Sequence, residues 1–214
     1  MQRGTTRVLP TGHNTLDTAL GVGGLPRGLV EFTSTSLTAS CTLALQLSAR
    51  VQRDGGVAAF IDARQELELE AARRVGVSPS ELLIAQPGTL LRAVELVKHI
   101  VRSGAVDLVV VDSLQDLDLG DKDELRKASE ELRQLVVSTS YTNATVLFLT
   151  RKPINKPGGA LSNTLRYLSA IRCEVVAIGR HARVRVLKNK HATPFTEATI
   201  ELEASEDLVA ALVS

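Results

Sequence analysis

Three short runs of consecutive apolar residues constrain the fold of this chain more than any other feature. They are VAAFID at residues 57–62, VDLVVVD at 106–112 and TVLFLT at 145–150. A strand with one solvated face alternates apolar and polar side chains, whereas a strand covered on both faces is apolar throughout. Stretches with helical periodicity separate the three runs. The pattern therefore predicts an α/β fold, with a mostly parallel central sheet flanked by helices.

Periodicity and turn signals give the remaining expected elements. Further strands are expected at residues 29–33, 82–85, 174–178, 182–187 and 197–203, and helices at 13–20, 39–53, 65–75, 89–103 and 121–140. The last three strands are closely spaced, which predicts antiparallel strands at the C-terminal end of the sheet. Asn14 is the expected cap of the first helix. Residues 1–12 are expected to form an irregular lead-in, 13–204 one core domain, and 205–214 a short C-terminal helix.

Composition limits the classes of function. Aromatic residues make up only 3% of the chain, which disfavours an aromatic platform for stacking bases. The two cysteines lie far apart and the four histidines show no metal-ligand spacing, so neither a disulfide nor a metal site is predicted. No apolar run approaches the roughly 20 residues of a membrane span, and the N-terminus has no apolar signal core. We expect a cytoplasmic protein without membrane contact.

Several stretches, in the same order, resemble the ATPase core of the bacterial recombinase RecA. They are TGHNTLDTALGVGGLPRG, LVEF, AAFIDA, SGAVDLVVVDS, TVLFL, PGGALSNTLRYLSAIR and VRVLKNKHATPF. The resemblance covers residues 11–202 and implies a RecA-like core. It also implies that two parts of that family are missing here: the N-terminal helix that links neighbouring subunits, and the C-terminal domain.

The resemblance implies a nucleotide site with a degenerate phosphate loop. The family pattern GxxxxGK[ST] falls on residues 34–41, where Ser34 and Ala39 replace the glycines, Ser40 the lysine and Cys41 the magnesium-binding hydroxyl. Glycines let the backbone approach phosphate, the lysine neutralises its charge and the hydroxyl ligates Mg²⁺. Losing all four predicts no bound nucleotide cofactor. Two alternatives are a Ser/Thr-rich cap for the next helix, and weak binding of phosphate or sulfate at its N-terminus.

Only one acidic position of the implied site is retained. Asp112 matches the family's magnesium-organising carboxylate. Arg64 stands in place of the catalytic glutamate, Ala71 in place of the adenine-stacking tyrosine, and Arg151 in place of the glutamine that senses γ-phosphate. One hypothesis is that Arg64 fills the space of the lost lysine and pairs with Asp112. The alternative is that Asp112 is an ordinary strand-end residue. In either case the resemblance predicts a protein without ATPase activity.

Charge is distributed unevenly along the chain. Residues 151–191 carry ten basic side chains against the single acid Glu174, a net charge of +9, whereas residues 114–131 carry a net charge of −4. The resemblance implies that these regions flank the family's two DNA-binding loops. The first loop is acidic here, and the second is basic. Its candidate DNA contacts are Arg151, Lys152, Lys156, Gly158 and Gly159. The alternative is a solvated basic loop on a protein that binds other proteins.

A second group of residues matches the surface through which RecA subunits meet. Lys188 and Lys190 match the two lysines with which one subunit reaches the ATP of the next. Arg166 and Tyr167 fall in the neighbour-contact segment and keep its basic and aromatic character. The resemblance implies a surface that faces a partner. The alternative is a pair of strand-edge lysines on a solvated face.

Taken together, the resemblance implies a non-catalytic RecA-like accessory protein in DNA repair, recombination or damage-induced (SOS, translesion) mutagenesis. It would bind RecA or the end of a RecA filament, as a cap or adaptor, with a translesion polymerase component as a further partner. Two alternatives remain open. One is a direct single-stranded DNA binder that uses the basic residues 151–191, and the other is a weak ATPase of an unconventional kind.

Overall fold

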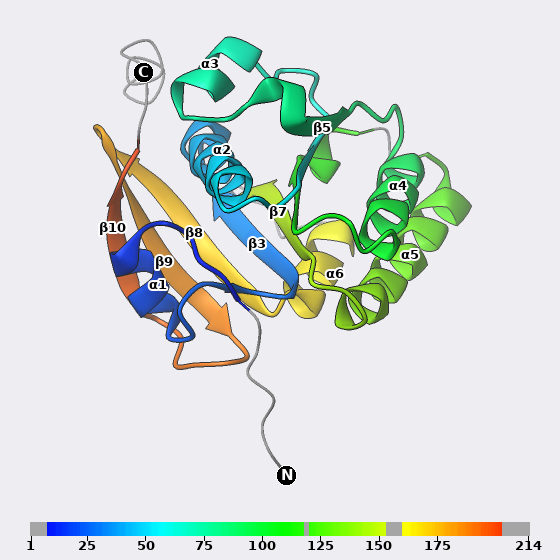
Figure 1. Ribbon diagram of the computed structural model, residues 1–214. Helices are drawn as coiled ribbons and strands as arrows, with labels where there is room; N and C mark the ends of the chain where they lie inside the picture. Colours follow the sequence, from blue (N-terminus) through cyan, green and yellow to red (C-terminus); the bar gives the residue numbers. More distant parts are fainter. Residues whose placement is uncertain (1–7, 118–119, 153–159, 203–214) are drawn as a thin grey trace.

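The computed structural model describes residues 8–117, 120–152 and 160–202 (Figure 1). Its centre is an eight-stranded sheet in the order β10-β9-β8-β3-β7-β6-β4-β5. Neighbouring strands from β8 to β5 are parallel, and β9 runs antiparallel to both of its neighbours, β8 and β10. The predicted α/β fold is confirmed. The strands are β3 (Gly28–Ser34), β4 (Ala58–Asp62), β5 (Leu82–Ala85), β6 (Leu108–Asp112), β7 (Thr145–Arg151), β8 (Ile171–Ile178), β9 (His181–Asn189) and β10 (Glu197–Glu201).

Helices cover both faces of the sheet, as Figure 1 shows. On one face lie α1 (Asn14–Leu20), α2 (Leu37–Arg53) and α3 (Leu69–Arg74); on the other lie α4 (Leu90–Arg102), α5 (Lys122–Ser140) and α6 (Ala160–Leu168). Successive residues of β6 alternate between the two apolar clusters, with Val110 in one and Val111 in the other. Burial on both faces explains why the central strands are apolar without alternation.

Short elements complete the described part of the chain. β1 (Val8–Leu9) pairs antiparallel with β2 (Leu25–Pro26), and η1 (Pro79–Glu81) and η2 (Leu114–Asp116) are single 3₁₀ turns. Residues 8–9 were expected within an irregular lead-in, but they pair because Leu25 is fully buried and Leu9 packs against the same apolar cluster. The expected C-terminal helix at 205–214 lies outside the described residues.

Three expected helix features differ from the structure. The helix expected at 65–75 is only α3, because the Asp62 carboxylate accepts hydrogen bonds from Glu66 N (3.1 Å) and Leu67 N (3.2 Å) and holds this stretch as a loop. His13, rather than Asn14, is the N-cap of α1, and its side chain makes no cap hydrogen bond. The segment that forms α6 was not expected to be helical.

Two strand and helix boundaries are explained by their flanking residues. β8 begins at Ile171, three residues before its expected start, and Ile171 is fully buried beside Val30 of β3. α5 has the strongest local start signal in the described chain. Asp121 accepts hydrogen bonds from Asp123 N and Glu124 N while the Glu124 side chain returns to the Asp121 backbone, which is a capping box.

Within the described residues, no helix is both long enough and apolar enough to cross a bilayer.

Candidate functional site

The loop between β3 and α2 is shorter than the phosphate loop that it matches. α2 begins at Leu37, two residues before its expected start, so only Thr35 and Ser36 separate strand from helix. Ser36 is the N-cap but makes no side-chain cap hydrogen bond. The expected Ser/Thr capping is therefore wrong in detail. Instead, Ser34 Oγ accepts from Ser36 N (3.2 Å) and donates to Ser36 O (2.5 Å), which closes a local turn.

The backbone of residues 34–41 does not form a phosphate cradle. In the described chain, the only non-glycine residues with positive φ are Gln65 and Phe195, so none lies in this stretch. Concave nests of N–H groups need residues in the left-handed region, which glycine adopts at little cost. Leu37 and Ala39 take up helical conformations instead and are buried. Helix thus occupies part of the segment that would otherwise be an open loop.

Asp112 lies at the C-terminal end of β6, beside Arg64 and Cys41. Arg64 Nε is 3.6 Å from Asp112 Oδ1, so the hypothesised ion pair is present, although neither atom has a hydrogen-bond partner. The buried Cys41 thiol lies close enough to the Asp112 carboxylate for each to shift the pKa of the other. A second nitrogen of Arg64, Nη2, contacts Glu66. The retained carboxylate is therefore closed in by side chains of the chain itself.

Burial governs the protonation of this group. It raises the pKa of Asp112 to about 6, and the nearby Arg64 charge and Cys41 thiol only partly oppose that rise. The Cys41 residue is partly exposed, but its thiol is withdrawn from water and faces Asp112, and both effects raise its pKa. Cys41 consequently stays a thiol at neutral pH, and a neutral thiol is a poor substitute for the hydroxyl that it replaces as a magnesium ligand.

The turn that carries Arg64 is anchored to the ends of β4 and β6. Ala63 N donates to Asp112 O (2.8 Å), and Asp62 accepts from Gln86 Nε2 (3.0 Å) as well as from the backbone of the loop. Gln65 has a φ of 57°, in the left-handed region. These contacts hold the backbone of the turn in place, and this turn places the Arg64 side chain beside Asp112.

Other residues of the implied nucleotide site are not drawn into this cluster. Ala71 is a partly buried residue of α3. Arg151 is exposed at the end of β7, where its side chain lies 3.5 Å from Asp116 and its N–H donates to Gln115. Ser40 is buried within α2, and its hydroxyl has no hydrogen-bond partner.

The lysines expected to face a partner contact the end of α6. Lys188 Nζ donates to Arg166 O (2.8 Å) and Tyr167 O (2.9 Å), and Lys190 Nζ lies 3.5 Å from Leu168 O. Partial desolvation, together with the charges of Lys190 and Arg172, lowers the pKa of Lys188. Arg166 and Tyr167 are exposed. The structure therefore brings all four predicted residues together on one surface, with both ammonium groups at the helix C-terminus.

Several cations of the basic segment 151–191 form ion pairs. Lys152 pairs with Glu174 (2.5 Å), Arg172 with Glu31, and Arg185 with Glu197 (3.3 Å). The exposed Arg180 and Arg183 have no ion pair among the described residues. Of the candidate DNA contacts, Lys156, Gly158 and Gly159 lie outside the described residues.

A buried polar cluster beneath the site was missed from the sequence. Glu31 of β3 is 1% exposed; its carboxylate contacts Arg172 of β8 and accepts from Thr150 Oγ1 of β7 (2.9 Å). The signal was present, because a glutamate in the middle of the apolar strand LVEF needs a partner. The cluster links three adjacent strands.

Comparisons with known proteins agree with this fold. A family model described as the RecA N-terminal domain matches residues 2–208. Protein RecA 1 of Myxococcus xanthus is 38% identical over 227 aligned positions, covering 91% of this chain and 66% of the relative. RecA of Leifsonia xyli is 36% identical (94% and 64% covered), and RecA of Thermus thermophilus is 37% identical (91% and 66% covered). The chain thus spans slightly less than two thirds of these relatives.

Proposed function

Since this chain belongs to the RecA family, we propose that it is a member without nucleotide chemistry that acts by binding. It would serve as an accessory protein in DNA repair, recombination or SOS mutagenesis. In this role it docks onto RecA or onto the end of a RecA filament as a cap or adaptor. A translesion polymerase component is a further partner of the same kind.

The main support for the proposed lack of ATP hydrolysis is that the Asp112 carboxylate is paired with Arg64 of the same chain. Arg64 occupies the position of the glutamate that would activate water, and a guanidinium cannot act as a general base at neutral pH. The absence of both glycines, the lysine and the hydroxyl from residues 34–41 supports the same conclusion. The early start of α2 adds a steric reason.

Calorimetric titration with MgATP tests this part of the proposal. We expect no heat of binding at ATP concentrations that saturate a RecA control, and no release of phosphate. The informative comparison restores the missing groups together: Ser34→Gly, Ala39→Gly, Ser40→Lys, Cys41→Thr and Arg64→Glu. Micromolar, magnesium-dependent ATP binding by the unmodified protein would overturn the proposal, whereas recovery only in the restored variant supports it.

The surface around α6 supports the docking part. Lys188 and Lys190 are fixed by backbone carbonyls at the end of α6, next to the exposed Arg166 and Tyr167. Two ammonium groups held in this way present a compact positive charge. That charge suits an anionic group, such as a triphosphate bound by a neighbouring subunit.

Cosedimentation with RecA filaments on single-stranded DNA tests docking. The double variant Lys188→Glu and Lys190→Glu should lose binding to filaments formed with a slowly hydrolysed ATP analogue. The matched control reverses two exposed cations of α5, Arg126→Glu and Lys127→Glu, and should bind as the wild type does. Equal binding by both double variants would contradict the proposed surface, and circular dichroism verifies that each is folded.

A further inference from the structure

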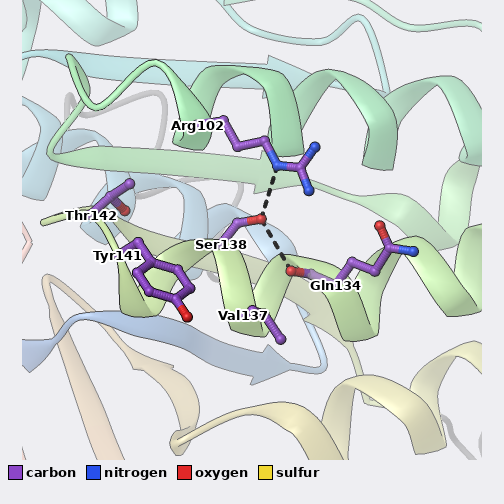
Figure 2. Close-up of a pocket in the computed structure, with 6 residues that line it drawn as sticks. All are labelled: Arg102, Gln134, Val137, Ser138, Tyr141 and Thr142. Atoms are coloured by element: carbon purple, nitrogen blue, oxygen red, sulfur yellow. Dashed lines mark hydrogen bonds between the residues drawn. The ribbon is translucent and has the colours of Figure 1, made fainter.

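A groove of about 370 Å³ lies between the C-terminal ends of α4 and α5. Figure 2 shows Arg102 entering from α4, opposite residues of α5 and the turn that follows it. Arg102 Nε donates to Ser138 Oγ (3.2 Å), and this hydroxyl donates to Gln134 O (3.1 Å). The chain of hydrogen bonds fixes the guanidinium on one wall. The lining residues are Arg102, Gln134, Val137, Ser138, Tyr141 and Thr142.

The other wall carries apolar side chains that the fold does not require. Val137 is 58% exposed and Tyr141 86%. The preceding exposed face of α5 is charged, with pairs such as Glu130 and Arg133 three residues apart. Large apolar groups gathered at one end of an otherwise polar helix are typical of a contact surface, and tyrosine is among the residues enriched in such surfaces.

Charge around the groove has one sign. Its lining contains a cation and no carboxylate. A second arginine lies alongside, because Arg27 Nη1 donates to Thr142 O (3.4 Å) and Asn143 Oδ1 (3.3 Å). Neither Arg27 nor Arg102 forms an ion pair among the described residues. The acids on this part of the molecule are already engaged: Lys98 binds Glu131, and Asp107 accepts from Val57 N.

The groove is remote from the Asp112 cluster. Thr139, near the end of α5, lies over Gly28 at the start of β3, whereas Asp112 lies at the end of β6. Because these strands are parallel, the groove lies at their N-terminal ends and the Asp112 cluster at their C-terminal ends. Binding to the groove therefore does not depend on whether the Asp112 cluster binds or hydrolyses nucleotide.

We propose that this groove binds an acidic peptide segment of a partner protein. The segment would insert an aliphatic or aromatic side chain between Val137 and Tyr141 and set a carboxylate against Arg102. Charge complementarity favours an acidic ligand, and the apolar wall favours a peptide over nucleic acid. A nucleic acid would need a track of cations along its backbone, and the groove offers two arginines beside apolar side chains.

Phage-displayed random peptides, selected on the full chain and depleted on the Tyr141→Asp variant, supply a defined probe. We expect enriched sequences with Asp or Glu next to an aliphatic or aromatic residue. A synthetic peptide of the enriched sequence should bind about tenfold more weakly to Tyr141→Asp and to Arg102→Glu. Replacing its acid by lysine should restore binding to Arg102→Glu and weaken binding to the wild type.

Two matched variants control for general effects. Tyr167→Asp changes the other tyrosine, which is 80% exposed on α6, and Arg126→Glu changes an exposed arginine of α5. Both should bind the peptide as the wild type does. Enriched peptides without acids, or equal binding to Tyr141→Asp, would overturn the proposal. So would oligo(dT) binding that Tyr141→Asp abolishes, or a concentration-dependent dimer in sedimentation that the same change dissociates.

Discussion

Asp112 and Arg64 share a space closed to most water, yet their charged atoms are 3.6 Å apart without a hydrogen bond between them. Their attraction only partly offsets the cost of removing the Asp112 carboxylate from water, and the pKa of Asp112 therefore rises to about 6. A carboxylate in this state destabilises the folded protein whenever it is ionised.

The first prediction concerns stability and pH. Asp112 has an ordinary pKa of 3.8 and a folded-state pKa of about 6, so the folded protein binds this proton more tightly than the unfolded chain does. Its contribution is therefore most favourable below about pH 4 and is lost as pH rises to about 6. Asp112→Asn, which resembles the protonated form, should be more stable than the wild type at pH 7, by up to about 3 kcal/mol.

Urea unfolding of both proteins at several pH values measures this difference. The gain from Asp112→Asn should shrink steadily as pH falls from 7 to 4. The control is Asp116→Asn, which removes a nearby acid outside the buried pair and should show a much smaller trend. A stability difference that is the same at pH 4 and pH 7 would show that Asp112 titrates normally.

At the scale of residues, the sequence indicated which side chains belong to the candidate sites, but not all of the contacts that they make. The pair of Arg64 and Asp112 could be anticipated, because the resemblance placed both at one site. The contact of Lys188 with the end of α6 could not, because it depends on a helix that periodicity did not reveal. Gly158 and Lys156 lie outside the described residues, so their predicted role stays a prediction.

At the scale of elements, the Glu31 cluster links β3, β7 and β8 side by side in the middle of the sheet. Apolar packing between these strands tolerates slippage in register more readily than a specific polar contact does. Thr150 and Arg172 together satisfy the buried carboxylate. We infer that this cluster fixes how the C-terminal strands join the parallel sheet.

The second prediction tests that role. Arg172→Ala leaves the Glu31 carboxylate buried without its countercharge and should lower the free energy of unfolding by about 3–5 kcal/mol. Arg185→Ala is the matched control, because its pair with Glu197 is exposed and should contribute less than about 1 kcal/mol. Urea denaturation measures both. If Glu31→Gln combined with Arg172→Ala is no more stable than Arg172→Ala alone, the stranded charge is not the cause.

The sequence predicted the existence of most described strands and helices but not all of their limits. Continuous apolar runs identified β4, β6 and β7, since burial on both faces leaves that pattern. α3 was overestimated because the hydrogen bonds of Asp62 to the following backbone are a local competitor to helix. α2 was underestimated by two residues, because a comparison with glycine-rich loops suggested a loop where Cβ-bearing residues favour helix.

For the molecule as a whole, the formal charge of the basic segment 151–191 exceeds the charge that remains free to bind a ligand. Residues 151–191 carry a net charge of +9, but ion pairs engage Arg151, Lys152, Arg172 and Arg185. Exposed pairs such as Arg185 with Glu197 are weak and can open, whereas the partly buried Arg172 stays paired with the buried Glu31. The surface that remains for an extended anion is small.

The third prediction follows for single-stranded DNA, the main alternative ligand. Among the described residues, the exposed cations without an ion pair in this segment are Arg166, Arg180, Arg183 and Lys190. Contact with about four phosphates gives a log–log slope of affinity against salt of roughly −3, at about −0.7 per phosphate. Fluorescence anisotropy with labelled oligo(dT) measures it. A slope steeper than roughly −5 would reveal a larger DNA surface and favour direct binding.

Arg64 beside Asp112 has one more consequence, which concerns timing. In a motor or switch protein, nucleotide binds to the pocket and is released again, and each release returns the protein to its starting conformation. If the chain binds no nucleotide, as proposed, Arg64 stays beside Asp112 at every ATP concentration. The lifetime of any complex would then depend on the abundance of this protein and on nucleotide turnover by its partner.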